Sequence, residues 1–181
     1  MGWSEMKTIV TERLTLRRFT PEDAEPAFRN WASDPEVTRY VTWPPHRAPE
    51  ETRRAVEEWI GRYDTPGYYH WAIQREGECI GFLVAGVDVR KRSAAVGYAI
   101  GRAWWGQGLL PEALGAVIAF LFRETDVRRI AACHDTRNPN SGRVMQKCGM
   151  RYEGTWREAG LNNSGVCDEA WYSILRREFE E

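Results

Sequence analysis

The sequence predicts one α/β domain in which a mixed, mostly antiparallel sheet is flanked by helices. Segments with a period-two alternation of apolar residues are interspersed with segments that carry an apolar stripe at helical spacing. The chain has 181 residues, of which 43% are hydrophobic, so it can bury one good core and is short for two. No linker, internal repeat or low-complexity tract interrupts the pattern. We therefore expect a single domain over residues 1–181.

The first half of the chain predicts one strand, two helices and three further strands. The first strand covers residues 11–18, where apolar and polar side chains alternate. Thr20 followed by Pro21 marks the start of a helix, and Pro49 opens a second one. The apolar stripe of the second helix is formed by Val56, Trp59, Ile60 and Tyr63. The consecutive antiparallel strands that follow are residues 69–74, 78–89 and 93–100.

The second half of the chain predicts two helices and three strands. One helix runs from Pro111 to about Phe122. Its apolar face comprises Leu114, Val117, Ile118 and Leu121. The remaining segments are a strand at residues 128–134, a short helix near Ser141, and strands near residues 152–158 and 169–175 around a loop at residues 160–165. The chain is therefore expected to end in two consecutive strands.

The composition argues against several classes of partner. The formal net charge is −1, which gives no electrostatic footprint for nucleic acid or for an anionic membrane surface. No apolar run approaches the roughly 18 residues of a membrane span. The four cysteines form no C-x-x-C pair, and the three histidines lack metal-ligand spacing. We expect a cytoplasmic protein with reduced thiols, no metal, and no nucleic-acid or membrane partner.

A glycine-rich turn ahead of the helix at Pro111 is the strongest functional signal. Gly106 and Gly108 stand one residue apart just before this helix. Glycine lets the backbone approach a ligand closely, and proline at a first helical position presets φ without losing a hydrogen bond. The first amides of the helix then lack intrahelical partners and point at whatever lies in front of them. The segment predicts an anion site, and a phosphate compound is the first hypothesis.

Two nucleotide interpretations of this segment fail on its residues. A P-loop needs Lys and then Ser or Thr after its second glycine, whereas Gln107 and Gly108 follow Gly106. A dinucleotide fingerprint, G-x-G-x-x-G, needs a third glycine, and Pro111 stands at that position. The remaining alternative to a phosphate site is a glycine-rich turn without a ligand.

A second segment, residues 138–150, predicts a short capped helix. Ser141 is a good N-cap, and Gly149 can end the helix in the left-handed region. The apolar face is formed by Val144, Met145 and Cys148. Taken alone, the segment is an ordinary short helix. Its significance comes from its position downstream of the glycine-rich turn.

The two segments together resemble the motifs of the GNAT acyltransferase superfamily. The acetyl-CoA pyrophosphate loop of that family is written R/Q-x-x-G-x-G/A, and in residues 105–110 only Gly108 matches it strictly. The wider W-G-x-G form followed by E-A is typical of the Rim-type branch, which contains the ribosomal-protein N-terminal acetyltransferases. Residues 138–150 resemble the second motif, N-x-x-S-x-x-V/L-M/L-x-K-x-G-F/M. Further stretches similar to Rim-type members are residues 11–17, 20–24, 96–101 and 168–175.

The resemblance implies the GNAT fold and acetyl-CoA as the acetyl donor. The family's second motif lies beside the pantetheine arm and thiol, which implies contacts from Asn138 and Ser141. The Ser141 hydroxyl is then the implied proton donor to the leaving thiolate. The other implied cofactor-binding residues are Tyr98, Ala99, Ile100, Trp105, Gly106, Gln107, Gly108, Leu109 and Leu110. No motif places a cysteine as an acyl carrier, so direct transfer in a ternary complex is implied, and homodimers are common in the family.

The general base is poorly defined by the sequence. Many relatives carry Glu just before the central I/V-G-Y, where this chain has Ala95. Some Rim-type enzymes are proposed to use a Glu after the second motif, and the nearest register puts Gly160 there. Glu158 is therefore the candidate base, and Glu112 and Asp168 are weaker ones. Each of the three is also consistent with a solvated surface charge or a capping charge.

The lack of an obvious base favours a weakly basic acceptor. Neutralising an α-amine of pKa near 8 at pH 7 costs about 1.4 kcal/mol, against about 4.6 kcal/mol for a lysine of pKa near 10.4. A protein or peptide N-terminal α-amine is therefore the expected substrate. In Rim-type relatives the region between the first two helices helps to line the acceptor groove, so the resemblance implies substrate contacts from Trp43 and His46. The alternative is an aromatic staple that packs under this loop.

Two other functions stay open. A small-molecule amine, such as a drug, a polyamine or a nucleotide-peptide, would fit the same aromatic groove. A CoA-binding module without turnover is the alternative from another class, and Ala95 and the departure at Leu110 favour it slightly. Activity on N-terminal peptides, activity on small amines alone, and binding without thiol release distinguish the three.

Overall fold

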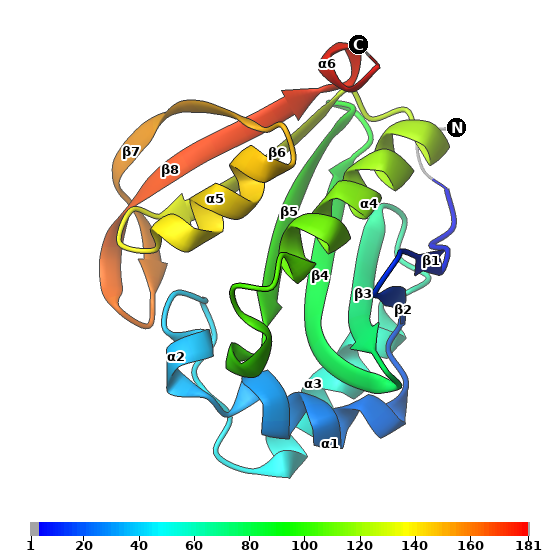
Figure 1. The fold of residues 1–181 in the computed structure, drawn as a ribbon, viewed down its shortest axis with the longest axis vertical. Coiled ribbons are helices and arrows are strands. Elements are labelled where there is room, and N and C mark those ends of the chain that lie inside the picture. The colour runs from blue at the N-terminus through cyan, green and yellow to red at the C-terminus, as the bar shows by residue number, and fades with distance from the viewer. Residues whose placement is uncertain (1–3, 181) are drawn as a thin grey trace.

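The computed structural model describes residues 4–180, and its framework is one eight-stranded sheet (Figure 1). The strand order is β1-β2-β3-β4-β5-β6-β8-β7. The strands are β1 (Ile9–Val10), β2 (Thr15–Arg18), β3 (Tyr68–Arg75), β4 (Glu78–Asp88), β5 (Ser93–Ile100), β6 (Arg129–Asp135), β7 (Arg151–Asn162) and β8 (Gly165–Leu175). Every neighbouring pair is antiparallel except β5 with β6. The predicted mixed, mostly antiparallel α/β fold is thereby confirmed.

The parallel strands β5 and β6 are joined over a short stretch. Among the described residues they form three residue pairs, the last of which joins Ala95 to Ala131. Beyond this point the two strands diverge, as Figure 1 shows. Backbone N–H and C=O groups in residues 96–100 and 132–135 therefore need other partners on these facing edges. We call this stretch the β5–β6 opening.

Helices cover both faces of the sheet. On one face, α4 (Leu109–Glu124) packs on the strands and α5 (Pro139–Lys147) packs beside it (Figure 1). On the other face, α1 (Ala24–Ala27) and α3 (Pro49–Gly61) lie over β3 and β4. The short α2 (Pro35–Thr38) lies between them in the sequence, and α6 (Arg176–Phe179) follows β8.

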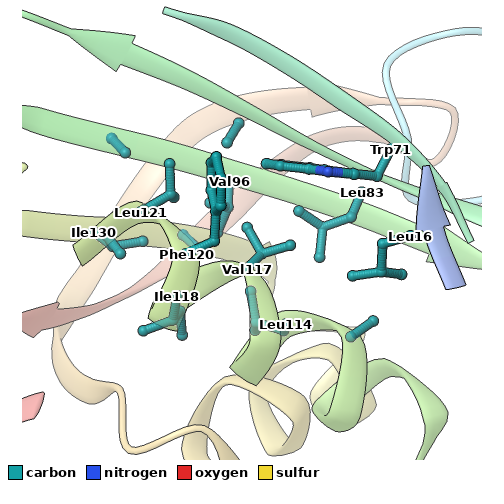
Figure 2. Packing of buried hydrophobic residues seen from close by; sticks show 14 of the residues in the cluster. Leu16, Trp71, Leu83, Val96, Leu114, Val117, Ile118, Phe120, Leu121 and Ile130 are labelled. Atoms are coloured by element: carbon teal, nitrogen blue, oxygen red, sulfur yellow. The ribbon is translucent and has the colours of Figure 1, made fainter. Parts of the chain in front are cut away.

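The larger core lies between the sheet and α4. Leu114, Val117 and Leu121 of the helix are 0% exposed. They point toward strand residues such as Leu16 and Leu83 (Figure 2). Fully burying a side chain of this kind stabilises the fold by about 1.5–3 kcal/mol. These residues recur at helical spacing in the sequence, so they form one apolar face of α4, and this face packs on the sheet.

A smaller, aromatic core lies under α1 and α3. Trp31 is fully buried and stacks on Trp59 with ring centroids 6.1 Å apart. Beside them lies His70 of β3, whose Nδ1 is 2.8 Å from the Tyr68 hydroxyl. Its Nε2 has no partner among the described residues. Burial, assisted by the charge of Arg62, lowers the pKa of His70 to about 3, so the ring is neutral at physiological pH.

Two helix starts differ from the sequence prediction. α4 begins at Leu109 with Gly108 as its N-cap, so Pro111 is the third helical residue and not the first. The missing N–H of this proline is still one of the donors that have no intrahelical partner. α5 begins at Pro139 after Asn138, which puts Ser141 inside the first turn instead of at the N-cap. In both cases the residue that precedes the helix takes the non-helical conformation that the cap requires.

The last two strands are longer than predicted, and the loop between them is shorter. They remain paired through Leu161 with Val166 and Asn162 with Gly165, so the loop shrinks to residues 163–164. Gly165 has φ of +92°, and the Ser164 N–H donates to Asn162 Oδ1 at 2.7 Å. This tight turn allows the cross-strand ladder to continue almost to the end of the hairpin.

Only the second half of the predicted first strand, residues 11–18, is a strand, namely β2, and β1 lies before the predicted range. The Thr11 N–H donates to the Leu14 carbonyl at 2.9 Å, which forms a turn between β1 and β2. The two short strands then pair with each other at the edge of the sheet. The alternation of side chains alone gave no signal for this turn.

Candidate active site

The glycine-rich turn forms an open, left-handed loop at the start of α4. Gly106 and Gly108 have φ of +72° and +74°, a conformation that residues with a Cβ rarely adopt. Nothing lies within 4 Å of the place where a Cβ of Gly106 would be. The Glu112 N–H donates to the Gly108 carbonyl at 3.3 Å, so the helical amides of Leu109 and Leu110 come before the first intrahelical bond. With the helix dipole, they suit this end of α4 to an anion.

Arg13 holds this loop from the N-terminal segment. Its guanidinium donates to the carbonyls of Gln107 at 2.8 Å and Gly108 at 3.3 Å, and to Glu112 Oε2 at 2.6 Å. Glu112 Oε1 also accepts from the Thr11 hydroxyl at 2.6 Å. Burial acts to raise the pKa of Glu112, but the hydrogen bonds outweigh it and the pKa is lowered. Glu112, a weaker candidate base from the sequence, is thus an ionised anchor of the loop.

The side chain of Tyr98 joins β5 to α5 beside the β5–β6 opening. Its hydroxyl donates to the Ser141 carbonyl at 2.9 Å and lies 3.1 Å from Ser141 Oγ. Burial raises the pKa of Tyr98 well above its usual value, so the phenol stays protonated. Asn138 is the N-cap of the same helix. The structure therefore brings Tyr98 and the predicted residues of the second motif together on the α4 face.

Cys148 lies between α5 and α4. Its thiol donates to the Pro111 carbonyl with Sγ 3.3 Å from the oxygen. Burial raises the pKa of this thiol to about 11, and a thiol that stays protonated is a poor nucleophile. Cys148 is therefore unsuited to carry an acyl group.

The opposite face of the sheet holds a carboxylate that sequence reasoning missed. Side chains alternate along β8, so Cys167, Glu169 and Trp171 share the face turned away from α4. Glu169 Oε2 accepts from Trp171 Nε1 at 3.2 Å. A Cβ at Gly160 of β7 would lie 2.6 Å from Glu169 Oε1, so glycine leaves this space to the carboxylate. The available signal was Gly160 itself, at the register where some Rim-type enzymes are proposed to carry Glu.

Glu158 lies in an exposed bulge of the edge strand β7. The register of β7 with β8 shifts between Trp156 and Gly160, and within the bulge Glu158 has φ of +51°. Its N–H donates to Asp168 Oδ1 at 2.8 Å, so Asp168 holds the bulge. In the strand order β8 and β6 separate β7 from β5. The structure does not bring Glu158 to Ser141, and its role as the base stays a prediction.

Trp43 and His46 pack beside the aromatic core. Trp43 is half-buried, and its ring centroid lies 6.1 Å from that of Trp31. His46 Nδ1 is 2.7 Å from the Thr52 hydroxyl, and burial lowers the pKa of this histidine. The Asn163 side chain of the β7–β8 hairpin donates to the Trp43 carbonyl at 2.7 Å. Both aromatic side chains match the staple alternative, and their contact with an acceptor stays a prediction.

Within residues 4–180, no group of three or more His, Cys, Asp or Glu side chains is arranged to hold a metal ion. In the same part of the chain, no helix is long and apolar enough to cross a membrane. All four cysteines are free thiols.

Comparison with known proteins identifies the family. Residues 13–151 match the acetyltransferase (GNAT) domain. The chain belongs to the GNAT acetyltransferase family. Among its curated relatives, the N-acetyltransferase p20 of Bacillus licheniformis is 30% identical over 178 residues, which cover 96% of this chain and 99% of the relative. The ribosomal-protein-serine acetyltransferase of Escherichia coli is 23% identical over 169 residues, covering 92% and 94%.

Solved structures of GNAT proteins share the fold. An acetyltransferase of the GNAT family from Bacillus anthracis is 26% identical, with a TM-score of 0.84 over 94% of this chain and 99% of that one. RimL, a ribosomal L7/L12 α-N-protein acetyltransferase solved in complex with coenzyme A, has a TM-score of 0.84 at 21% identity, covering 93% and 98%. Members of the GNAT family use acetyl-CoA. This GNAT protein is therefore an acetyltransferase, as its sequence predicted.

Proposed function

We propose that this GNAT protein is an acetyl-CoA-dependent enzyme that acetylates the α-amine of a protein or peptide N-terminus. The observation that carries the proposal is the β5–β6 opening. Tyr98 and Ser141 lie on its α4 face, and Glu169 lies on the opposite face. Two substrates that approach from opposite faces can meet in such an opening, as direct transfer in a ternary complex requires. The similarity to a ribosomal-protein-serine acetyltransferase supports a protein amine as the acceptor.

The residues at the start of α4 fit the pyrophosphate of acetyl-CoA. The loop is open at Gly106, left-handed at both glycines, and held from behind by Arg13. Trp105 borders it and donates through Nε1 to the Ile100 carbonyl at 2.9 Å. The proposed pyrophosphate-binding residues are Trp105, Gly106, Gln107, Gly108, Leu109 and Leu110.

The free edge of β5 fits the pantetheine arm. Tyr98, Ala99 and Ile100 lie beyond the last β5–β6 pair. Backbone groups alternate along a strand, so those of Tyr98 and Ile100 face this edge while those of Ala99 face β4. The Ile100 carbonyl already accepts from Trp105 Nε1, which leaves the Tyr98 backbone and the Ile100 N–H to bond the amides of that arm. Asn138 stands across the opening at the start of α5. When bound, acetyl-CoA supplies the thioester carbonyl that the amine attacks. A backbone N–H of β5 would polarise that carbonyl.

Ser141 is the proposed proton donor to the leaving thiolate. Its hydroxyl lies 3.1 Å from the hydroxyl of Tyr98, which stays protonated and can position it. Loss of a general acid typically lowers the rate by on the order of 10²-fold or more. Ser141→Ala is expected to show such a loss in kcat. Undiminished turnover at saturating acetyl-CoA would remove this role.

Thermal unfolding with acetyl-CoA is the first test, with ATP and NAD as controls. Selective binding stabilises the folded state by about 2.7 kcal/mol at a hundredfold excess over Kd. A rise in Tm with acetyl-CoA alone is expected. An equal rise with ATP, or no rise with acetyl-CoA, would contradict the assignment of the loop.

The acceptor class is tested by thiol release from acetyl-CoA with three amines. These are a peptide with a free N-terminal serine, an N-acetylated peptide with one internal lysine, and spermidine. Only the first is expected to react efficiently. Reaction with spermidine alone would support the small-molecule alternative. Binding of acetyl-CoA without thiol release from any amine would support the CoA-binding module.

A further inference from the structure

Glu169 lies level with the β5–β6 opening. It stands opposite Asp135 of β6, and the last β5–β6 pair is Ala95 with Ala131. Asp135 and Ala99 each follow that pair by four residues, which is roughly 13 Å along a strand. They therefore mark the same level on the two sides of the opening. Glu169 is one strand away from the place where an acceptor nitrogen has to reach the thioester.

One oxygen of this carboxylate is uncommitted. Glu169 is half-buried, and its Oε2 accepts from Trp171 Nε1. Within residues 4–180, its Oε1 has no hydrogen-bond partner. That oxygen occupies the space beside Gly160 where any other residue would place a Cβ. A half-buried carboxylate with a free oxygen is suited to receive a donor from a ligand.

Two indoles flank the carboxylate. Trp156 is opposite Glu169 in the β7–β8 register, and its ring centroid lies 4.9 Å from that of Trp171. Trp156 is 59% exposed, so much of its apolar surface is not buried by folding. Indole faces attract organic cations within about 6 Å of the ring centroid. With the charge of the carboxylate, the two indoles suit this place to an ammonium group.

Two thiols and one carboxylate near Glu169 do not compete with it for a cation. The thiols are Cys133 on β6 and Cys167 on β8, and burial raises the pKa of both, that of Cys133 to about 12. Asp135, across from Glu169, forms an ion pair with Arg137 at 2.7 Å. From β7, Gly160 and Trp156 lie beside Glu169, and the bulge between them carries the exposed Arg157 and Glu158. Among the two thiols, Asp135 and Glu169, Glu169 is the one left to meet a positive charge.

We propose that Glu169, Trp171 and Trp156 form the acceptor subsite of this enzyme, in which the indoles hold the ammonium group and Glu169 takes its proton. The proposal rests on the acetyl transfer proposed above. The ammonium gives one proton to the Glu169 carboxylate, and the neutral nitrogen attacks the thioester carbonyl carbon. The C–N bond forms, the C–S bond breaks, and sulfur leaves with the electron pair. The sulfur receives the second nitrogen proton through Ser141, and Glu169 returns its proton to water.

Glu169→Gln tests the proton transfer in the full-length enzyme. With the peptide that has a free N-terminal serine, we expect kcat/KM to fall on the order of 10²–10⁴-fold. The acid limb of the pH profile should disappear, and the rise in Tm with acetyl-CoA should be unchanged. Glu57→Gln, the same substitution on the exposed side of α3, is the matched control and should keep the wild-type rate. An unchanged rate and pH profile in Glu169→Gln would overturn the proposal.

Gly160→Ala tests the same site while keeping the carboxylate. The added methyl group would lie 2.6 Å from Glu169 Oε1, so the carboxylate has to move. A loss of kcat/KM in the same direction is expected, with acetyl-CoA binding retained. A wild-type rate in this variant would show that the position of the carboxylate is unimportant.

Binding of a cation is measured without turnover by NMR of the indole N–H groups. Tetramethylammonium is the probe, tert-butanol is the neutral control, and Trp171→Phe assigns the signal. We expect the cation alone to shift the Trp171 signal, and Glu169→Gln to remove the shift. Shifts with both probes, or with neither, would overturn the subsite. A shift in an enzyme that acetylates no amine would reject the proposed function and leave the subsite standing.

Discussion

The α4 face of the sheet and the β7 end of the opposite face differ in how far their large apolar side chains are exposed. On the α4 face, Leu114, Val117 and Leu121 are completely buried. On the opposite face, β7 leaves Trp156 exposed beside Glu169. Apolar surface that is already buried stabilises the fold, whereas exposed apolar surface is available to a ligand. The contrast separates residues that hold this acetyltransferase together from residues that we propose to meet its substrate, and substitutions can test it.

The largest expected effect on stability is on the α4 face. Leu121→Ala removes most of a fully buried side chain from the α4 core. It should lower the free energy of unfolding by about 2–5 kcal/mol, from lost burial and the cavity left behind. Urea unfolding followed by circular dichroism measures this. A loss below that range would mean that the core collapses readily around the cavity.

The next effect belongs to the aromatic core and depends on pH. His70 has a pKa of about 3 in the folded protein, against about 6.5 when unfolded. The unfolded chain therefore binds more protons between these values, and stability falls as the pH drops below 6.5. At pH 5 the loss relative to neutral pH is about 2 kcal/mol.

His70→Phe is the variant that isolates this effect. Phenylalanine suits a site that already contacts Phe19 and Phe82, and it does not titrate. Unfolding free energies at pH 7.5 and 5.0 should differ by about 2 kcal/mol less in the variant than in the wild type. Equal differences in both proteins would show that folding does not lower the pKa of His70.

A smaller effect is expected in the glycine-rich loop that leads from β5 into α4. Gly108→Ala forces a side chain into φ of +74°, at about 1–2 kcal/mol. The strain should lower both the stability and the rise in Tm that acetyl-CoA produces.

Gly115→Ala is the matched control on the same helix. No atom lies within 4 Å of its added Cβ, and alanine inside a helix is better than glycine by up to about 1 kcal/mol. This variant should be as stable as the wild type or more so, with an unchanged response to acetyl-CoA. A similar loss in both variants would attribute the effect to α4 as a whole.

The smallest effect on stability is expected at the β7 end of the opposite face. Trp156→Ala should change the free energy of unfolding by about 0.5 kcal/mol or less, as exposed positions usually do. Its KM for the acceptor peptide should nevertheless rise, because an indole face is lost. A stability loss as large as that of Leu121→Ala would end the distinction between the two faces.

Local patterns in the sequence predicted most of the fold. The period-two strands and the apolar stripe of α4 depend on residues close in sequence, as does Gly149, which has φ of +79° at the end of α5. Helix starts were less accurate, because Gly108 and Asn138 competed with Pro111 and Ser141 for the capping positions. The cap is decided by backbone conformation, which residue type predicts only in part.

Glu169 was not predictable from local patterns. It is flanked by Gly160, Trp156 and Asp135 through the pairing of β7 and β6 with β8. Counting residues from the second motif leads to Gly160, where there is no carboxylate, and the acidic residue nearest to it in the chain is Glu158, in the bulge of β7. Contacts made by pairing of distant strands, with an irregular register, carry no periodic signal in the chain.

The three-pair junction of β5 and β6 has a mechanical consequence. Among the described residues, the strands β1 to β5 and the strands β6, β8 and β7 are joined only by these three pairs, so the two groups of strands separate along the β5–β6 opening. A substrate with amide groups that binds along residues 96–100 would supply the backbone hydrogen bonds that β6 does not make there, and so would stiffen β5. Amide hydrogen exchange in residues 96–100 should then slow when acetyl-CoA binds. The exchange rate of these amides would thus be a direct measure of whether the acetyl donor is bound.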